Sequence, residues 1–132
     1  MSDYHSILKY LAPKGKGKKE ITMEFNVTKK EIFNGKNNAQ KAEDFLDQTL
    51  TIKGMFTYED DVLNKETGEV SQATLVCLVT TAGDLISSPS KTLVDSAVKL
   101  YETFEDDTEG MDVKITAGKS NNGRTFYRLE VL

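Results

Sequence analysis

The last stretch of the chain, Met111–Leu132, constrains the fold most, because its pattern predicts a β-hairpin. Two strand-like runs flank a polar turn that ends in Asn122-Gly123, and Asn-Gly is a strong hairpin signal because both residues tolerate a positive φ. Side chains alternate between the two faces of a strand. The outward face of the second run is expected to carry Arg124, Phe126, Arg128 and Glu130, and the core face Tyr127, Leu129 and Val131.

An aromatic side chain between two arginines suits a nucleic acid, because the ring can stack on bases while the guanidinium groups pair with phosphates. Alternation also predicts a strand over Thr49–Tyr58, in which Gly54 indicates a bulge or a close approach. The candidate nucleic-acid-binding residues on these elements are Lys53, Tyr58, Lys114, Lys119, Asn121, Asn122, Arg124, Phe126 and Arg128. Pattern alone leaves open the alternative that Phe126 belongs to the core and the lysines are ordinary surface charges.

Further strands and one long helix are predicted upstream of the hairpin. The segments Ile21–Thr28, Ser71–Thr81 and Leu85–Ser87 have strand patterns, and the second is apolar enough to be buried on both faces. Ser88-Pro89-Ser90 predicts a helix start, with serine as the cap and proline just inside the helix. The apolar stripe of this helix is expected to be Leu93, Ala97, Leu100, Tyr101 and Phe104.

The segments between these elements have weaker patterns. Met1–Leu11 is expected to be weakly helical or irregular, Ile32–Gly35 to end a short strand or turn, and Ala39–Asp47 to close a helical turn or two. The order of elements predicts an all-β domain with one helix, a five-stranded Greek-key OB-fold barrel with the helix before the last two strands. An SH3-like barrel and an α+β sheet with one covering helix remain alternatives. Residues 1–20 are expected to be a flexible basic arm and 21–132 the OB-fold domain.

Charge is segregated along the chain, although the net charge is only −4. Lys9–Lys41 carries a charge of +6, Ala42–Asp112 carries −12 and Val113–Leu132 carries +3. A chain of this kind can present a basic groove on an acidic body. The negative net charge therefore does not exclude a polyanionic partner.

The composition excludes several classes of protein. Cys77 is the single cysteine and lies in an apolar run, so a disulfide framework is excluded and a buried, inert thiol is expected. The chain has neither a signal-peptide pattern nor an apolar run long enough to cross a bilayer, which favours an intracellular protein.

The sequence contains few of the residues that catalytic sites commonly use. His5 is the single histidine, and Cys77 lies far from it, so neither a catalytic triad nor a zinc site can be assembled. The acidic clusters Glu59-Asp60-Asp61 and Glu105-Asp106-Asp107 are expected to be solvated loop charges, and the alternative is a small enzyme that uses them to hold Mg²⁺. No enzyme activity, cofactor or metal is predicted.

Several segments, in their order, resemble the single-stranded DNA-binding proteins of phages that infect Gram-positive bacteria, including the small protein-primed phages. The matching segments are Glu31-Ile32-Phe33-Asn34, Thr49–Tyr58, Glu66–Val70, Leu85–Ala97 and Val113–Leu132. The last of these carries the most telling pattern, V-K-I-x-x-G-K-S-x-x-G-R-T-F-Y-x-L-x-V.

The resemblance implies an OB-type fold and non-sequence-specific coating of single-stranded DNA during phage replication or recombination, in the cytoplasm of the host. It also implies that the outward residues of the final hairpin and of Thr49–Tyr58 belong to the nucleic-acid face. The partners expected are single-stranded DNA and phage replication or recombination proteins; a homo-oligomer or a cooperative array on DNA stays open. The alternative function is a phage adaptor that docks a replication protein through its acidic middle.

Overall fold

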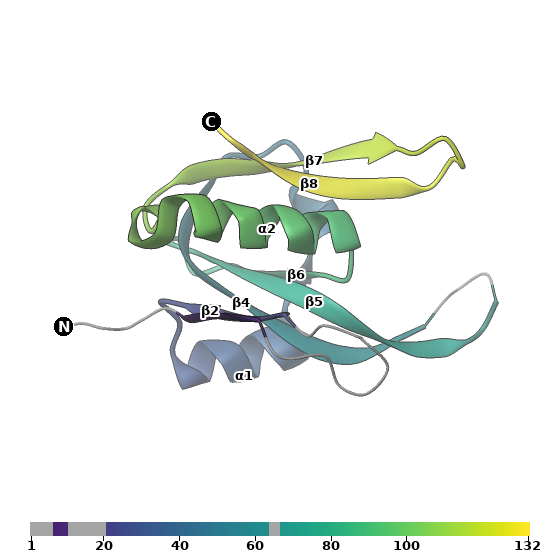
Figure 1. Ribbon diagram of the computed structural model, residues 1–132, viewed down its shortest axis with the longest axis horizontal. Helices are drawn as coiled ribbons and strands as arrows, with labels where there is room; N and C mark the ends of the chain where they lie inside the picture. The colour runs from purple at the N-terminus through teal and green to yellow at the C-terminus, as the bar shows by residue number, and fades with distance from the viewer. Residues whose placement is uncertain (1–6, 11–20, 64–66) are drawn as a thin grey trace.

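The computed structural model describes residues 7–10, 21–63 and 67–132, which form a curled β-sheet with two α-helices (Figure 1). The strands are β1 (Ile7–Tyr10), β2 (Ile21–Phe25), β3 (Gln40–Lys41), β4 (Leu50–Leu63), β5 (Val70–Thr80), β6 (Leu85–Ser88), β7 (Asp112–Lys119) and β8 (Thr125–Val131). The helices are α1 (Lys29–Asn38) and α2 (Lys91–Phe104), and each of the short 3₁₀ segments η1 (Ala42–Phe45) and η2 (Glu105–Thr108) adds one turn.

Strand β4 organises the sheet because three strands pair with it. It runs antiparallel to β5 from Ile52 to its end at Leu63 and to β2 over its middle, and its first residues pair with β7. The strand order is β1-β2-β4-β5-β6-β3, and β8 joins through β7. The register between β4 and β5 shifts between Ile52 and Gly54, where a Cβ on Gly54 would lie 2.4 Å from the carbonyl oxygen of Phe25. The predicted bulge and close approach at Gly54 are both confirmed.

The main hydrophobic core lies between α2 and the curled sheet. Helix α2 begins after the N-cap Ser90, whose hydroxyl accepts a hydrogen bond from the Leu93 amide at 3.4 Å. Pro89 therefore lies before the cap and not inside the helix as the sequence predicted. The predicted apolar stripe is confirmed, since Leu93, Ala97, Leu100 and Tyr101 are buried and Phe104 packs against the same core.

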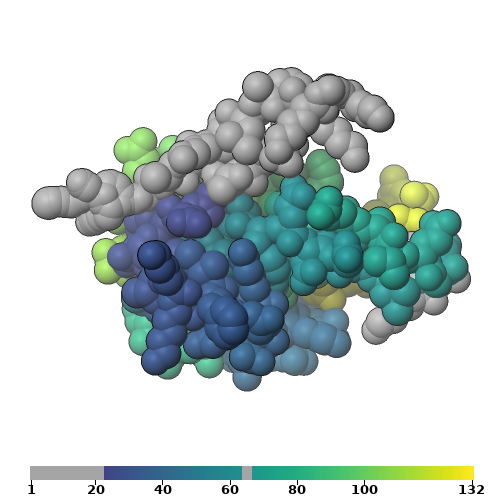
Figure 2. Space-filling view, turned by 90° about the horizontal axis from the view of Figure 1, so that it is seen from below, coloured from purple at the N-terminus to yellow at the C-terminus, as the bar shows by residue number. Residues whose placement is uncertain are grey.

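Helix α1 covers the other face of β4 and β5 and encloses a second hydrophobic cluster of Phe56, Cys77 and Val79. The prediction of a short strand or turn at Ile32–Gly35 is wrong, because this segment is the middle of α1. Thr28 and Glu31 form a capping box that starts the helix. This second layer explains why β4 and β5 are buried on both faces. Figure 2 shows α1 on the underside of the molecule.

The remaining predictions have mixed outcomes. The terminal hairpin, β5, β6 and α2 are confirmed, and β4 extends five residues beyond the predicted Tyr58. The segment Ala39–Asp47 forms β3 and η1 instead of helical turns alone. The described strands number eight, so the sheet is larger than the five-stranded barrel that was predicted.

At the N-terminus, Ile7–Tyr10 is a strand paired with β2 and not the weakly helical or irregular segment expected. The rest of the predicted flexible arm, residues 1–6 and 11–20, lies outside the described residues. Neither α1 nor α2 is long and apolar enough to cross a membrane, a finding that covers the described part of the chain.

Candidate nucleic-acid interface

The pairing of β7 with β8 fixes which side chains of the terminal hairpin face outward. Lys114 lies opposite Glu130, Thr116 opposite Arg128 and Gly118 opposite Phe126, and cross-strand partners share a face. Val113 and Ile115 on the other face are completely buried. The predicted outward face of the hairpin is therefore confirmed, and Phe126 lies outside the hydrophobic core. Val131, which was expected to face the core, is 48% exposed at the end of β8.

The Phe126 ring rests on the backbone of Gly118 across the hairpin. A Cβ at residue 118 would lie 2.7 Å from the ring, so any larger residue there would push the ring away. The guanidinium carbon of Arg128 lies 5.6 Å from the ring centroid, within the range of a cation–π contact. Gly118 and Arg128 together hold the half-buried ring as a flat platform.

A cleft with a volume of about 790 Å³ separates the β4–β5 hairpin from the β7–β8 hairpin. Both hairpins project to the right of Figure 1, and the connection from β6 to α2 lies between them. The residues that line the cleft are Lys41, Ala42, Glu43, Val62, Leu63, Ser87, Ser88, Pro89, Ser90, Lys91, Thr92, Ser120, Arg124, Thr125, Phe126 and Tyr127. Segments far apart in the sequence thus meet in one depression.

The cleft combines positive charge with apolar and aromatic surface. Lys41, Lys91 and Arg124 are its cations, and Glu43 is the single carboxylate among the lining residues. Lys91 is exposed, and its ammonium lies 3.9 Å from the carboxylate of Asp95, which is a weak exposed ion pair. The N-terminal end of α2 also opens onto the cleft, and the helix dipole there favours negative charge. This environment suits a nucleic-acid strand, because its phosphates can pair with the cations and its bases can stack on the aromatic surface.

Strand β8 forms one wall of the cleft with its free edge, because among the described strands it pairs with β7 alone. The first turn of α2 holds this edge at one point: the Thr92 hydroxyl donates to the Tyr127 carbonyl oxygen at 2.7 Å. The Tyr127 amide donates to the Ser90 hydroxyl at 3.4 Å. The helix start thereby positions Arg124 and Phe126, which precede Tyr127, at the cleft.

A smaller hollow of about 210 Å³ adjoins the cleft, and the two share Lys41, Ser87 and Pro89. The half-buried ring of Tyr58 lines this hollow, and its hydroxyl is hydrogen-bonded to the Ser87 hydroxyl at 2.6 Å. Burial raises the pKa of Tyr58 above its ordinary value of 10.0, against the opposing effect of the Ser87 hydrogen bond. The phenol is therefore neutral at physiological pH and presents an uncharged ring.

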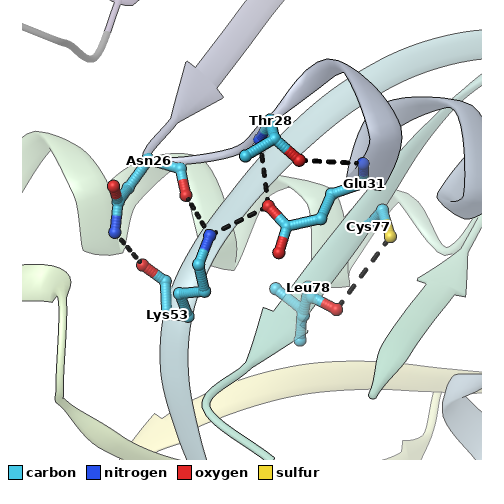
Figure 3. A network of polar contacts seen from close by, with 6 residues as sticks. All are labelled: Asn26, Thr28, Glu31, Lys53, Cys77 and Leu78. Carbon is cyan, nitrogen blue, oxygen red and sulfur yellow. Dashed lines mark hydrogen bonds and ion pairs between the residues drawn. The ribbon is translucent and has the colours of Figure 1, made fainter. Parts of the chain in front are cut away.

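Lys53 lies apart from the cleft in the polar network of Figure 3. Its ammonium donates to the Glu31 carboxylate and to the Asn26 carbonyl oxygen, each at 2.9 Å. The Asn26 side chain in turn donates to the Lys53 carbonyl oxygen at 2.9 Å, and Asn26 has a φ of 51°. The structure thus places Lys53 where it ties the start of α1 to β4.

The other predicted site residues divide into three groups. Arg124 and Phe126 line the cleft and Tyr58 lines the adjoining hollow. Asn121 and Asn122 are exposed at the hairpin turn next to Lys119, the last residue of β7. Lys114 and Arg128 lie on the outer face of the hairpin and do not line the cleft.

Sequence reasoning missed the basic residues that the fold brings to the cleft from outside the two predicted strands. Lys41 ends β3, and Lys91 is the first residue of α2. The sequence predicted a helix start at Ser88–Ser90. It did not show that this helix start lies beside the terminal hairpin, which is what brings Lys91 to the cleft. In the described part of the chain, no three His, Cys, Asp or Glu side chains are grouped so that they could hold a metal ion.

A curled β-sheet with a basic and aromatic cleft between two hairpins is typical of proteins that bind single-stranded nucleic acids. The chain belongs to the family of phage single-stranded DNA-binding proteins, whose model matches residues 16–132. It is 27% identical over 117 aligned residues to the single-stranded DNA-binding protein of Bacillus phage B103, a match that covers 83% of this chain and 94% of that relative. No solved structure matches the chain.

Proposed function

We propose that this protein binds single-stranded DNA without sequence preference in the cleft between its two hairpins, and coats the strand during phage DNA replication. Membership of the phage single-stranded DNA-binding protein family supports the class of ligand. The observation that carries the location is the convergence of Lys41, Lys91 and Arg124 around the Phe126 platform. Stacking tolerates any base, and contacts with phosphates ignore sequence, so this arrangement predicts a general binder.

We further propose that the binding domain is an enlarged OB-fold. Strands β4 to β8, with α2 between β6 and β7, follow the predicted order of strands and helix in a five-stranded Greek-key barrel. The two hairpins that flank the cleft then correspond to the loops that bind oligonucleotides in OB-folds. On this interpretation β1, β2, β3 and α1 are additions to the barrel.

The decisive experiment compares oligothymidine with duplex DNA of equal length at moderate salt, by fluorescence anisotropy. Bases inside a duplex hide their faces by stacking on each other, so the Phe126 platform can contact unpaired bases only. We expect the single strand to bind at least about tenfold tighter. Equal affinities would contradict the stacking model and leave a general polyanion surface. Lack of binding to either DNA at low salt would favour the adaptor function.

A further inference from the structure

The outer face of α1 carries an aromatic side chain among lysines, although it lies outside the cleft. Lys29, Lys30, Phe33 and Lys36 are all exposed, and Phe33 is 66% exposed. Positions 29, 33 and 36 fall within about 60° of each other around a helix of 3.6 residues per turn. They therefore form one stripe in which the phenyl ring lies between two ammonium groups.

The charges on this face are unbalanced. Glu31 is the single carboxylate in α1, and it turns inward, where it accepts hydrogen bonds from Lys53 and from the Thr28 amide. Ile32 packs inward against the second hydrophobic cluster. The exposed face of α1 consequently has three lysines, two asparagines and Phe33, and no exposed carboxylate. Its charge is complementary to a polyanion, and its ring can stack on a base.

This face is continuous with the cleft. Lys36 and Asn37, at the last turn of α1, line the hollow that also contains Tyr58. The same hollow shares Lys41, Ser87 and Pro89 with the main cleft. A strand that leaves the cleft past Lys41 therefore meets the hollow and then the stripe on α1. Figure 2 shows α1 on the face of the molecule turned toward the viewer.

We infer that the α1 stripe of Lys29, Phe33 and Lys36 is a second contact surface for the single-stranded DNA held in the cleft. This inference rests on the proposed function. The strand passes from Phe126 across Lys41 and the Tyr58 hollow to α1, where one base stacks on Phe33 and the flanking phosphates pair with the lysines. The surface accordingly contributes to binding only when the oligonucleotide is long enough to reach it.

The test is a length series of oligothymidines from about 4 to about 16 nucleotides, the range of site sizes found for OB-folds. For Phe33→Ala we expect affinity for the longest oligomer to fall about fivefold to a hundredfold, the loss of one stacked base. Affinity for the shortest oligomer should remain unchanged. Phe33→Trp should restore binding, and Phe33→Leu should not, because leucine keeps the apolar contact and lacks the flat ring.

Salt titrations test the lysines of the stripe separately. Lys29→Gln combined with Lys36→Gln should flatten the logarithmic salt dependence for the longest oligomer by about 1.4, because each lysine that no longer pairs with a phosphate removes about 0.7. Lys99→Gln is the matched control, since Lys99 is an exposed lysine of α2 that lies outside the cleft. It should bind all lengths like the unmodified chain.

Three outcomes would overturn the inference. If Phe33→Ala binds every length normally while Arg124→Ala weakens all of them, the α1 path is wrong and the cleft function stands. If Phe33→Ala weakens the shortest and longest oligomers equally, Phe33 does not act as a distal contact. If it alters sedimentation of the free protein and leaves DNA affinity intact, the stripe is a contact between copies of the chain. Failure of the unmodified chain to bind any oligomer would instead contradict the proposed function.

Discussion

Phe126, the proposed stacking residue, has its ring position set by two neighbours. Gly118 provides the space under the ring, and Arg128 lies 5.6 Å from the ring centroid. We expect Phe126→Ala to weaken single-strand binding by about 1–3 kcal/mol, because the variant cannot stack a base at this position. The free energy of unfolding should fall by only about 1 kcal/mol, since the variant loses one cross-strand contact with Gly118 and one exposed cation–π contact with Arg128. Anisotropy and chemical denaturation measure the two effects on the same variant.

The opposite result would have a clear meaning. A loss of about 3–5 kcal/mol of folding stability, the usual effect of removing a core phenylalanine, would return Phe126 to the core. Tyr127→Ala is a useful comparison, because Tyr127 packs against the core from the other face of β8. That variant should lose more stability than Phe126→Ala.

The ion pair of Glu31 predicts a pH dependence of stability. Burial raises the pKa of Glu31, but hydrogen bonds from Lys53 and Thr28 and the charge of Lys53 outweigh this effect and hold the pKa below 4.5. Because the folded state lowers this pKa, its stabilising effect is complete above pH 4.5 and is lost as the pH falls through the lowered value. Glu31→Gln, which keeps the capping box, should cost about 1 kcal/mol or less at pH 7.

Denaturation curves between pH 7 and pH 3 would measure this loss. The stabilities of the unmodified chain and of Glu31→Gln should converge once the Glu31 carboxyl is protonated. A constant difference across this range would mean that the glutamine variant removes packing and not charge.

Cys77 offers a chemical test of the second hydrophobic cluster. Burial raises the pKa of its thiol from 9.0 to about 12. At pH 8 the fraction of thiolate should therefore be about a thousandfold smaller than for an ordinary cysteine, and thiolate is the reactive form. We expect the native protein to resist iodoacetamide, and the denatured protein to react at once. Rapid labelling of the native chain would show that α1 opens readily.

At the residue scale, the sequence could predict which face of a strand each side chain occupies. It could not predict contacts between side chains that are far apart in the sequence. Alternation gave the outward set of β8 correctly because its other face packs on a core. The same rule offered Lys53 as a phosphate contact, but the structure engages its ammonium with Glu31 and Asn26. These partners precede it by 22 and 27 residues, and no local pattern reports such pairs.

At the scale of elements, patterns succeeded where a segment buries one clear stripe. Helix α2 was found from its cap and its apolar spacing, since both signals are local. Helix α1 was missed because it is short and buries little beyond Ile32 and Gly35, so its periodicity is weak. The capping box at Thr28 and Glu31 was the available signal. The β4–β5 hairpin extends as a paired ladder past its buried part to Leu63 and Val70.

The basic segment that contains lysines 14, 16, 18 and 19 allows a prediction about a single element of the chain. Its lysines at 14, 16, 18 and 19 lie outside the described residues, so the prediction comes from the sequence. Replacing all four with glutamine should weaken single-strand binding mainly at low salt, where exposed charges are least screened. Anisotropy at two salt concentrations measures this, and unfolding should be unchanged because the substitutions leave β1 in place. Equal losses at both concentrations would indicate specific contacts instead.

The whole molecule explains why the site could be predicted only in part. The cations of the cleft come from β3, from the start of α2 and from the terminal hairpin, which are separated by 50 and 33 residues. The resemblance and the hairpin pattern together predicted the class of ligand, and the family match confirms the resemblance. The path of the DNA depends on which loops meet when the sheet curls, and this is a property of the tertiary fold.

Charge segregation leads to a prediction about the whole chain, whose net charge is −4. If DNA binding depended on the net charge, added salt would screen repulsion and strengthen binding. If it depends on Lys41, Lys91 and Arg124 in the cleft, salt should weaken it, because each phosphate contact releases counterions. For an oligothymidine that fills only the cleft, we expect a slope of log K against log salt of about −2, from three contacts of about −0.7 each.

The substitutions Lys41→Gln and Arg124→Gln should each reduce the steepness of this slope by about 0.7, and Lys99→Gln should leave it unchanged. The slope is the informative quantity, because a variant that merely loosens the fold lowers affinity at every salt concentration alike. A flat or positive slope for the unmodified chain would place the DNA elsewhere on the molecule. A normal slope for both cleft variants would remove Lys41 and Arg124 from the interface, even if binding to single strands itself were strong.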